Sequence, residues 1–337
     1  MTCTICDSDT LTFRGQIEGY KSKSYFSIFE CAKCGTSHAE PRIVDELIYD
    51  AVYKNLSKVP GYSRYNDLAN RILRETNPLN YIANLEECYF AVRKILVEQV
   101  TDKSGTTILE IGCGQGYLTY ALARAGFDVV CVDISERAID LARKRYGDHY
   151  YCGTLKEVVE SRPEGPQFIV ATELVEHLSD PVLFVSETLR FLGPGGSLIL
   201  TTPNKHMAGG SIWNTELPPV HLWWLTRSAL VEIAKKVDCE ISVISLEDFY
   251  KTHIKYRHID DGLLLQRKPV LNEDYELIQA VPEETFLASM KRRLKKVLPT
   301  SFVTKCQRVC AKYKNLHLVD NNVPDTLCVT YTRRRST

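Results

Sequence analysis

The chain has 337 residues, a length that fits about two domains. Hydrophobic residues make up 44% of the chain and charged residues 25%, as in ordinary soluble globular proteins. Lys+Arg and Asp+Glu both total 42, so the formal net charge is zero, and the composition argues against a general polyanion-binding protein.

The sequence also bears on the compartment. No apolar run approaches the ~20 residues that a bilayer-spanning helix needs. The first ten residues, MTCTICDSDT, contain neither the basic nor the apolar region of a secretory signal. We therefore expect a cytoplasmic protein without a transmembrane segment, and we expect its twelve cysteines to be metal ligands and buried thiols rather than disulfides.

The first block, residues 1–48, contains two Cys-x2-Cys pairs. These are Cys3 with Cys6 and Cys31 with Cys34. Each pair can direct two thiolates at one ion, and zinc prefers four tetrahedral ligands. A block this short buries little core, so bound metal would supply much of its folding energy. The spacing predicts a zinc ribbon whose zinc is structural, because four thiolates leave no open position for catalysis.

Residues 49–104 are expected to be a helical linker or lid. A stripe at helical spacing is formed by Leu85, Tyr89, Val92, Leu96 and Val100, and Gly105 follows it.

From residue 105 to 337, short apolar runs alternate with amphipathic stretches, which predicts a parallel α/β sheet. The predicted strands are Thr107–Ile111, Val129–Asp133, Gln167–Thr172, Ser197–Thr202, Glu240–Leu246 and Asp325–Arg333. The predicted helices are Leu118–Ala125, Glu136–Arg145, Val182–Phe191 and Ser228–Val237. The polar stretch 250–322 is expected to be an insertion before the last strand.

A glycine-rich loop follows the first of these strands, in ILEIGCGQG at 108–116. Gly112, Gly114 and Gly116 permit a tight turn and let backbone amides approach a ligand. Asp133 ends the next strand, where a carboxylate can accept hydrogen bonds from ribose hydroxyls. Position 117 is Tyr, so the loop departs from the dinucleotide fingerprint.

ILEIGCGQG together with VVCVDIS resembles the first two motifs of class I methyltransferases. The resemblance continues through ATELVEHLSDP at 171–181, LGPGG at 192–196 and LILTTPN at 198–204. It implies a Rossmann-like sheet with one antiparallel strand, here Asp325–Arg333, and S-adenosylmethionine as cofactor. By this resemblance, the three glycines contact the methionine part of the cofactor, and Glu110 lies beside its amino group. Asp133 contacts the ribose, and Thr154 lies on the adenine side.

Glu173, Glu176 and His177 follow one predicted strand end, at spacings that in a helical turn put all three close to one face. His221 follows the next predicted strand end. We expect all four beside the cofactor's methyl group, because adjacent parallel strands open on one edge of a sheet. The E-x-x-E-H pattern resembles ubiquinone-biosynthesis O-methyltransferases. It also resembles small-RNA 2′-O-methyltransferases, which hold a divalent metal with two Glu and two His. The second resemblance implies Mg²⁺ or Mn²⁺ here. The metal-free alternative makes His221 a general base.

Two further features have two interpretations each, and a third has one. Trp213, Trp223 and Trp224 could stack on an acceptor or belong to the core. The basic run at 291–296 could contact RNA or a membrane surface, or pack on its own domain. Cys306 and Cys310 are interpreted as helix packing.

The zinc-ribbon and methyltransferase layout resembles bacterial enzymes that modify sugars, polysaccharide precursors or secondary metabolites. We therefore expect O-methylation of a small molecule or glycan. Three alternatives stay open: an RNA 2′-O-methyltransferase with a divalent metal, a sugar C-methyltransferase, and a non-catalytic binding protein on the same fold.

Overall fold

The computed structural model describes residues 2–59, 62–160, 164–208, 216–252, 256–258, 268–278, 316–318 and 324–334. Trp213, the basic run 291–296, the pair Cys306 and Cys310, and most of the expected insertion lie outside the described residues.

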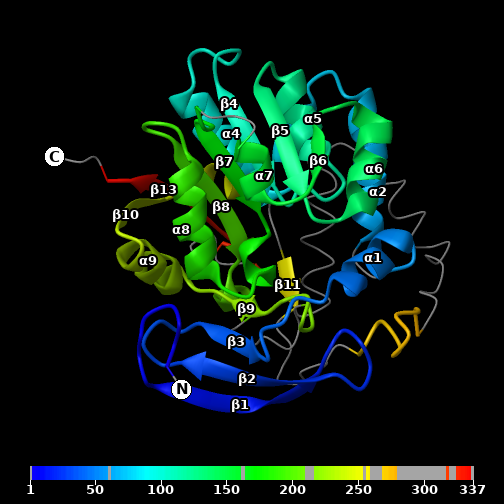
Figure 1. Ribbon diagram of the computed structural model, residues 1–337, viewed down its shortest axis with the longest axis vertical. Coiled ribbons are helices and arrows are strands. Elements are labelled where there is room, and N and C mark those ends of the chain that lie inside the picture. The colour runs from blue at the N-terminus through cyan, green and yellow to red at the C-terminus, as the bar shows by residue number, and fades with distance from the viewer. Residues whose placement is uncertain are drawn as a thin grey trace.

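A seven-stranded sheet forms the centre of the molecule, in the order β10-β13-β8-β7-β4-β5-β6 (Figure 1). The strands are β4 (Thr107–Ile111), β5 (Asp128–Asp133), β6 (Tyr150–Cys152), β7 (Phe168–Thr172), β8 (Ser197–Pro203), β10 (Cys239–Val243) and β13 (Thr326–Arg333). Strands β4 to β8 pair in parallel, and β13 runs antiparallel to both β8 and β10. The expected Rossmann-like sheet with an antiparallel final strand is confirmed.

Side chains of the central strands alternate between two helical layers, as the two-residue period of a strand requires. Ile108 and Ile199 pack with α3 (Pro78–Ala83), α4 (Glu87–Gln99) and α5 (Tyr117–Arg124). Leu109 and Leu198 belong to the cluster that includes α8 (Pro181–Phe191) and α9 (Arg227–Lys236). Helix α6 (Glu136–Tyr146) packs against β5 and β6. Both faces of the sheet are covered, so the free edge at the strand ends is left for a ligand.

Polar caps fix where several helices begin. Ser135 accepts the backbone N–H of Ala138 at the start of α6, and Thr226 accepts that of Ala229 at the start of α9. Asp180 accepts two backbone N–H groups at the start of α8, where Pro181 occupies the first helical position. Such caps satisfy N–H groups that have no partner within the helix.

The expected helical segment contains α1 (Glu46–Lys54), α2 (Ser63–Arg71) and the 3₁₀ turn η1 (Ile72–Arg74), followed by α3 and α4. Tyr89, Val92 and Leu96 form the buried stripe of α4. The prediction for Leu85 was wrong, because α4 begins only at Glu87 and Leu85 is 47% exposed. Leu85 therefore does not belong to the buried stripe of α4.

The N-terminal block forms a second, four-stranded sheet in the order β1-β2-β3-β9. Strands β1 (Leu11–Glu18), β2 (Tyr25–Cys31) and β3 (Ser37–Glu40) come from the block, whereas β9 (Trp223–Trp224) comes from the stretch after β8. In Figure 1 this sheet lies beneath the main sheet, with β9 next to β3. The pairing of β3 with β9 thus joins segments on the two sides of the expected domain boundary at residue 48.

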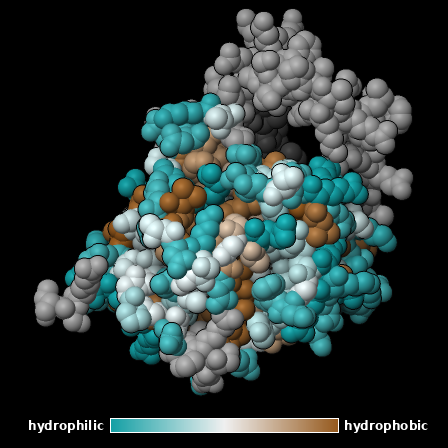
Figure 2. Space-filling view, turned by 90° about the horizontal axis from the view of Figure 1, so that it is seen from above, coloured by the Kyte–Doolittle hydropathy of each residue, from teal (hydrophilic) through white to brown (hydrophobic). Residues whose placement is uncertain are grey.

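The remaining described elements are short. They are α7 (Leu155–Glu160), η2 (Val175–His177), η3 (Lys205–Ala208), α10 (Glu247–Thr252), β11 (Tyr256–His258) and β12 (Leu316–Leu318). Within the described ranges, no helix combines the length and apolarity that crossing a bilayer requires. On the face shown in Figure 2, hydrophobic patches are interrupted by hydrophilic residues.

Candidate active site

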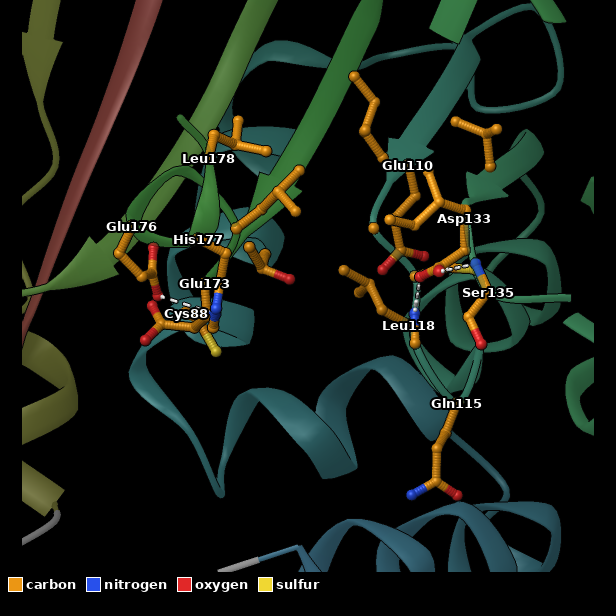
Figure 3. A pocket seen from close by; sticks show the side chains of 18 of the residues that line it. Cys88, Glu110, Gln115, Leu118, Asp133, Ser135, Glu173, Glu176, His177 and Leu178 are labelled. Atoms are coloured by element: carbon orange, nitrogen blue, oxygen red, sulfur yellow. Dashed lines mark hydrogen bonds and ion pairs between the residues drawn. The ribbon is translucent and has the colours of Figure 1, made fainter. Parts of the chain in front are cut away.

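A cavity of about 1190 Å³ opens at the carboxyl ends of the parallel strands. Strand order reverses between β4 and β7, and open α/β sheets bind ligands at that point. The cavity has two sides. Figure 3 shows Glu110, Asp133 and Ser135 on one side, and Glu173, Glu176 and His177 on the other.

The glycine loop adopts a backbone that side chains disfavour. Gly112, Gly114 and Gly116 have φ angles of 73°, 51° and 77°, in the left-handed region that glycine enters readily. Space is also limited, because a Cβ on Gly112 would lie 2.8 Å from Leu174, and one on Gly116 would lie 2.7 Å from Ala142. The three glycines are therefore needed for the turn itself, and Gly112 and Gly114 line the cavity.

Asp133 faces this loop from the end of β5. Its two carboxylate oxygens accept the backbone N–H groups of Gly114 and Ser135, each at 2.9 Å. Burial raises the pKa of Asp133, while the two backbone hydrogen bonds oppose that shift. The carboxylate keeps lone pairs for further donors and lines the cavity, so it can accept hydroxyl groups of a ligand.

Glu110 and Thr154, the other expected cofactor contacts, also line the cavity. Glu110 is buried, and its carboxylate accepts a hydrogen bond from Thr119. Burial raises the pKa of Glu110 to about 7. Thr154 is exposed, and both its backbone N–H and its hydroxyl donate to Glu157.

On the opposite side, Glu176, His177 and His221 offer ligand atoms that all lie within 4.8 Å of one another. Thr202 donates to Oε2 of Glu176 at 2.9 Å. The other oxygen, Oε1, is buried without a hydrogen-bond partner among the described residues and lies 3.8 Å from Nε2 of His177. An acceptor buried in this way, next to two imidazoles, suits a cation.

The tautomer of His177 follows from its neighbour. Nδ1 lies 2.6 Å from the carbonyl oxygen of Val220, which can only accept a hydrogen bond, so Nδ1 carries the proton. Burial lowers the pKa of His177 to about 4. The imidazole is therefore neutral near pH 7, and its Nε2 lies 3.8 Å from Oε1 of Glu176.

Glu173 lines the same cavity but is not one of these three residues. Its φ of 50° is unusual for a residue other than glycine, so the helical spacing expected from Glu173 to Glu176 does not apply. Its carboxylate instead accepts a hydrogen bond from Thr201 at 3.0 Å. Burial raises the pKa of Glu173 to about 7, which is suitable for proton transfer near neutral pH.

Comparison with known proteins places this geometry in a family. Residues 82–243 match the family model described as a methyltransferase domain. The chain contains a class I methyltransferase domain.

Curated relatives match only part of the chain. The chain is 32% identical over 120 residues to a ubiquinone biosynthesis O-methyltransferase of Coxiella burnetii, a match that covers 34% of this chain and 51% of that protein. A protein of the same description from Aliivibrio fischeri is 26% identical over 152 residues, covering 43% and 62%. The chain thus spans about half the length of the Coxiella relative.

Among solved structures, a Thermotoga maritima protein described as a SAM-dependent methyltransferase and possible histamine N-methyltransferase superposes with a TM-score of 0.45. Its sequence identity is 15%, and the match covers 85% of this chain and all of that one.

Beside the methyltransferase domain, helix α1 contributes residues that the sequence analysis missed. Tyr49 and Tyr53 are four residues apart and both line the cavity. The hydroxyl of Tyr49 lies 3.2 Å from Nδ1 of His177, and that of Tyr53 lies 3.1 Å from where a Cβ on Gly114 would stand. One helix thus covers both sides of the cavity. In the sequence their spacing indicates only a shared helix face, so it did not point to the cavity.

Arg64, on α2, is a third missed residue of the cavity wall. Its guanidinium donates to the hydroxyl of Tyr65 at 2.6 Å and lies 3.6 Å from the carboxylate of Glu86. It brings a positive charge to a wall that is otherwise rich in carboxylates.

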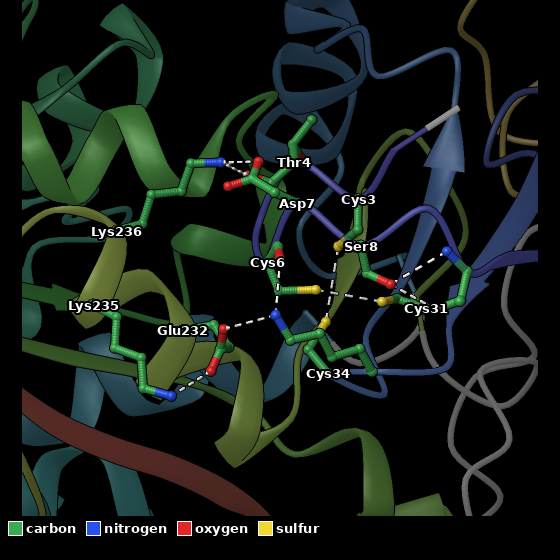
Figure 4. Close-up of polar contacts among 12 residues, drawn as sticks. Cys3, Thr4, Cys6, Asp7, Ser8, Cys31, Cys34, Glu232, Lys235 and Lys236 are labelled. Carbon is green, nitrogen blue, oxygen red and sulfur yellow. Dashed lines mark hydrogen bonds and ion pairs between the residues drawn. The ribbon is translucent and has the colours of Figure 1, made fainter.

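The four expected zinc ligands meet in the N-terminal block (Figure 4), and none of them lines this cavity. Cys3, Cys6, Cys31 and Cys34 are buried, with all Sγ atoms within 4.8 Å of one another. Sγ of Cys3 lies 3.8 Å from that of Cys34, and Sγ of Cys6 lies 3.5 Å from that of Cys31. Tetrahedral Zn–S bonds of about 2.3 Å place sulfurs roughly 3.8 Å apart, so the spacing fits zinc.

The tryptophans are part of the core where they are described. Trp223 and Trp224 are 1% and 5% exposed, and the indole N–H of Trp223 donates to the carbonyl of Leu178. Of the two interpretations, the structure favours core packing for this pair.

Proposed function

We propose that the protein is an S-adenosylmethionine-dependent O-methyltransferase whose acceptor is a hydroxyl group of a small molecule, sugar or polysaccharide precursor. The observation that carries the proposal is that one cavity joins the glycine loop and Asp133 to Glu173, Glu176, His177 and His221. The O-methyltransferases of ubiquinone biosynthesis that the domain resembles support the reaction type.

The cofactor side is suited to a nucleoside carrying an amino acid. S-adenosylmethionine supplies an electrophilic methyl group on a sulfonium. Asp133 would accept the ribose hydroxyls, the loop at Gly112 and Gly114 would allow close approach of the methionine part, and Glu110 would receive the ammonium group. All four of these residues line the cavity. The ammonium group would bring a positive charge next to deprotonated Glu110, and this attraction would offset the cost of burying the carboxylate.

On the acceptor side, Glu173 is assigned as the proton acceptor. Thr201 orients its carboxylate, and its neighbourhood keeps the pKa close to 7. A hydroxyl held within hydrogen-bond distance of Glu173 would lose its proton as it attacks the methyl group, and positioning supplies much of the remaining rate.

Glu176, His177 and His221 are assigned as ligands of a divalent cation such as Mg²⁺ or Mn²⁺. Three facts support this: the unpartnered Oε1 of Glu176, the Nε2 lone pair of His177, and the common 4.8 Å limit for all three ligand atoms. A ligand histidine usually donates its other N–H to a carbonyl, as His177 does to Val220. Such a cation lowers the pKa of a bound hydroxyl.

Structural zinc is assigned to Cys3, Cys6, Cys31 and Cys34. All four are buried thiols at tetrahedral spacing, and they leave no open coordination position.

A transfer assay tests the proposed function. The purified chain, with labelled S-adenosylmethionine and added Mn²⁺ or Mg²⁺, is incubated with separate pools of phenols, glycans and RNA. We expect label in a hydroxyl-bearing small molecule or glycan, and Glu173→Gln should reduce transfer by about 10²- to 10⁴-fold. Label confined to RNA would show that the acceptor is RNA rather than a small molecule or glycan. Binding of NADH without binding of S-adenosylhomocysteine would overturn the proposal.

A further inference from the structure

The acceptor-side histidines are held by one short loop, residues 217–222, which runs directly into β9. The loop contains His221, and its Leu217, Val220 and Leu222 are at most 2% exposed. Polar backbone groups buried to this degree need partners. Their partners lie on two opposite sides.

Toward the cavity, the loop contacts η2. The carbonyl of Val220 accepts the Nδ1–H of His177 at 2.6 Å, and the N–H of Leu222 donates to the carbonyl of Glu176 at 2.8 Å. The loop therefore fixes the ring orientation and tautomer of His177 and sets where His221 stands relative to Glu176.

Away from the cavity, the same loop is bonded to the N-terminal block. The carbonyl of Pro218 accepts the N–H of Tyr20 at 2.7 Å, and the carbonyl of Leu222 accepts the N–H of Ala39 at 2.9 Å. Contact is close, since a Cβ on Gly19 would lie 2.6 Å from the oxygen of Pro218. Immediately afterwards β9 pairs with β3.

The cysteine cluster lies at the start of this strand. Cys31 ends β2 and Ser37 begins β3, so the Cys31–Cys34 pair lies in the turn between the two strands. The carbonyl of Cys34 accepts the hydroxyl of Thr226 at 2.6 Å. Buried Lys205 donates to the carbonyl of Gly35 and pairs with Glu30. A metal on the cysteines would thus fix the turn that sets β3 against the loop.

We propose that the zinc ribbon positions the acceptor-side histidines, acting through β3 and residues 217–222, although it supplies no group to the cavity wall at those histidines. The ribbon is a positioning element rather than a catalytic one. The inference rests on the proposed function only in taking His177 and His221 as acceptor-side groups. Cofactor binding, which depends on the β4 and β5 ends, is independent of it.

One test removes a single hydrogen bond. Ala39→Pro deletes the N–H that Leu222 accepts and leaves the cysteines intact. Arg14→Pro is the matched control, because Arg14 lies at the bulge of β1 and has no register partner. We expect Ala39→Pro to lower kcat by about 100-fold, as a displacement near 1 Å can, with zinc content and S-adenosylhomocysteine affinity unchanged. Equal kcat values for the two variants would overturn the proposal.

A second test does not need turnover. In protein labelled with ¹⁵N-histidine, Cys34→Ser and Ala39→Pro should both shift the ring signals of His177 and His221, whereas those of exposed His206 should stay in place. Unshifted signals of His177 and His221 in zinc-free, folded Cys34→Ser protein would refute the positioning role. If the wild type transfers no methyl group but the ring signals still shift, the proposed function fails and the positioning stands.

Discussion

Oε1 of Glu176 and Nε2 of His177 lie 3.8 Å apart. Thr202 donates to the other carboxylate oxygen of Glu176, and the other ring nitrogen of His177 donates to the carbonyl of Val220. Both residues thus present one lone pair to the same small volume. In an ordinary buried polar network, two polar atoms this close would be hydrogen-bonded to each other. The acceptor side of the cavity differs from such a network in this respect.

Removing one of these lone pairs tests the cation. Glu176→Gln should reduce Mn²⁺ affinity and turnover by about 10- to 100-fold or more, the range seen when even outer partners of a metal ligand are lost. Electron paramagnetic resonance titration of Mn²⁺ measures binding, and His206→Ala is the control because His206 is exposed. Unchanged Mn²⁺ binding by the Gln variant would exclude a cation at this group.

Asp133→Ala should weaken S-adenosylhomocysteine binding severely, by about 10- to 100-fold, because hydrogen bonds to a charged group contribute roughly 1.5–3 kcal/mol. Isothermal calorimetry measures the change. Asp128→Ala, at the exposed start of the same strand, is the control and should bind normally. Normal binding by the Asp133 variant would show that Asp133 does not contact the ribose.

The pKa of Glu110, raised to about 7, predicts two pH effects of opposite sign. Between pH 4.5 and 7 the folded state holds a proton that the unfolded state has lost. The free energy of unfolding should therefore fall as pH rises, by up to about 1.4 kcal/mol per pH unit. Affinity for the ammonium-bearing cofactor should rise over the same range, since only the carboxylate attracts it.

Glu173, whose pKa is also raised to about 7, contributes a stability slope of the same sign. Glu110→Gln should therefore flatten the affinity profile and make the stability profile less steep. Urea unfolding at pH 5 and pH 7.5 and calorimetry with S-adenosylhomocysteine measure them. If this variant kept the wild-type slopes, groups other than Glu110 would be responsible for the pH dependence.

Gly116→Ala should destabilise the domain by more than Gly126→Ala does. Both glycines have positive φ, so each substitution carries backbone strain of about 1–2 kcal/mol. Only at Gly116 would the new Cβ also meet Tyr150 and Ala142, and overpacking adds typically 1–3 kcal/mol. Thermal unfolding of the two variants makes the comparison, and equal losses would contradict it.

Cys3→Ser should remove zinc from the protein, as measured by elemental analysis after purification without added metal. Cys152→Ser, at an exposed cysteine outside the cluster, should retain it. Full zinc content in the Cys3 variant would overturn the assignment of the cluster.

Much of the fold was predictable because its signals are local. Strand β4 was predicted at its observed bounds, and β5, β7 and β8 to within one residue at each end, since apolar runs bounded by turns define buried strands. The meeting of His221 with His177 also followed from the adjacency of β7 and β8. These inferences needed only periodicity and the topology of a parallel sheet.

What escaped prediction depends on long-range geometry. Strand β9 has only two residues, and its pairing with β3 joins segments nearly 190 positions apart, so no local pattern announces it. Tyr49 and Tyr53 have the spacing of any helical core pair, and only the fold brings them over the cavity. Glu173 departed from its expected place because its left-handed backbone interrupts the helical period.

The two-residue strand β9 has a consequence for how the chain can be divided. Cut after residue 48, the N-terminal sheet would expose β3 as an unpaired edge, a template for association with other chains. The remaining chain would lose the partners of Pro218 and Leu222 and expose Trp223, now 1% accessible. The N-terminal block is therefore not a detachable module. Exchange of this block between related enzymes should succeed only when the 217–224 segment is exchanged with it.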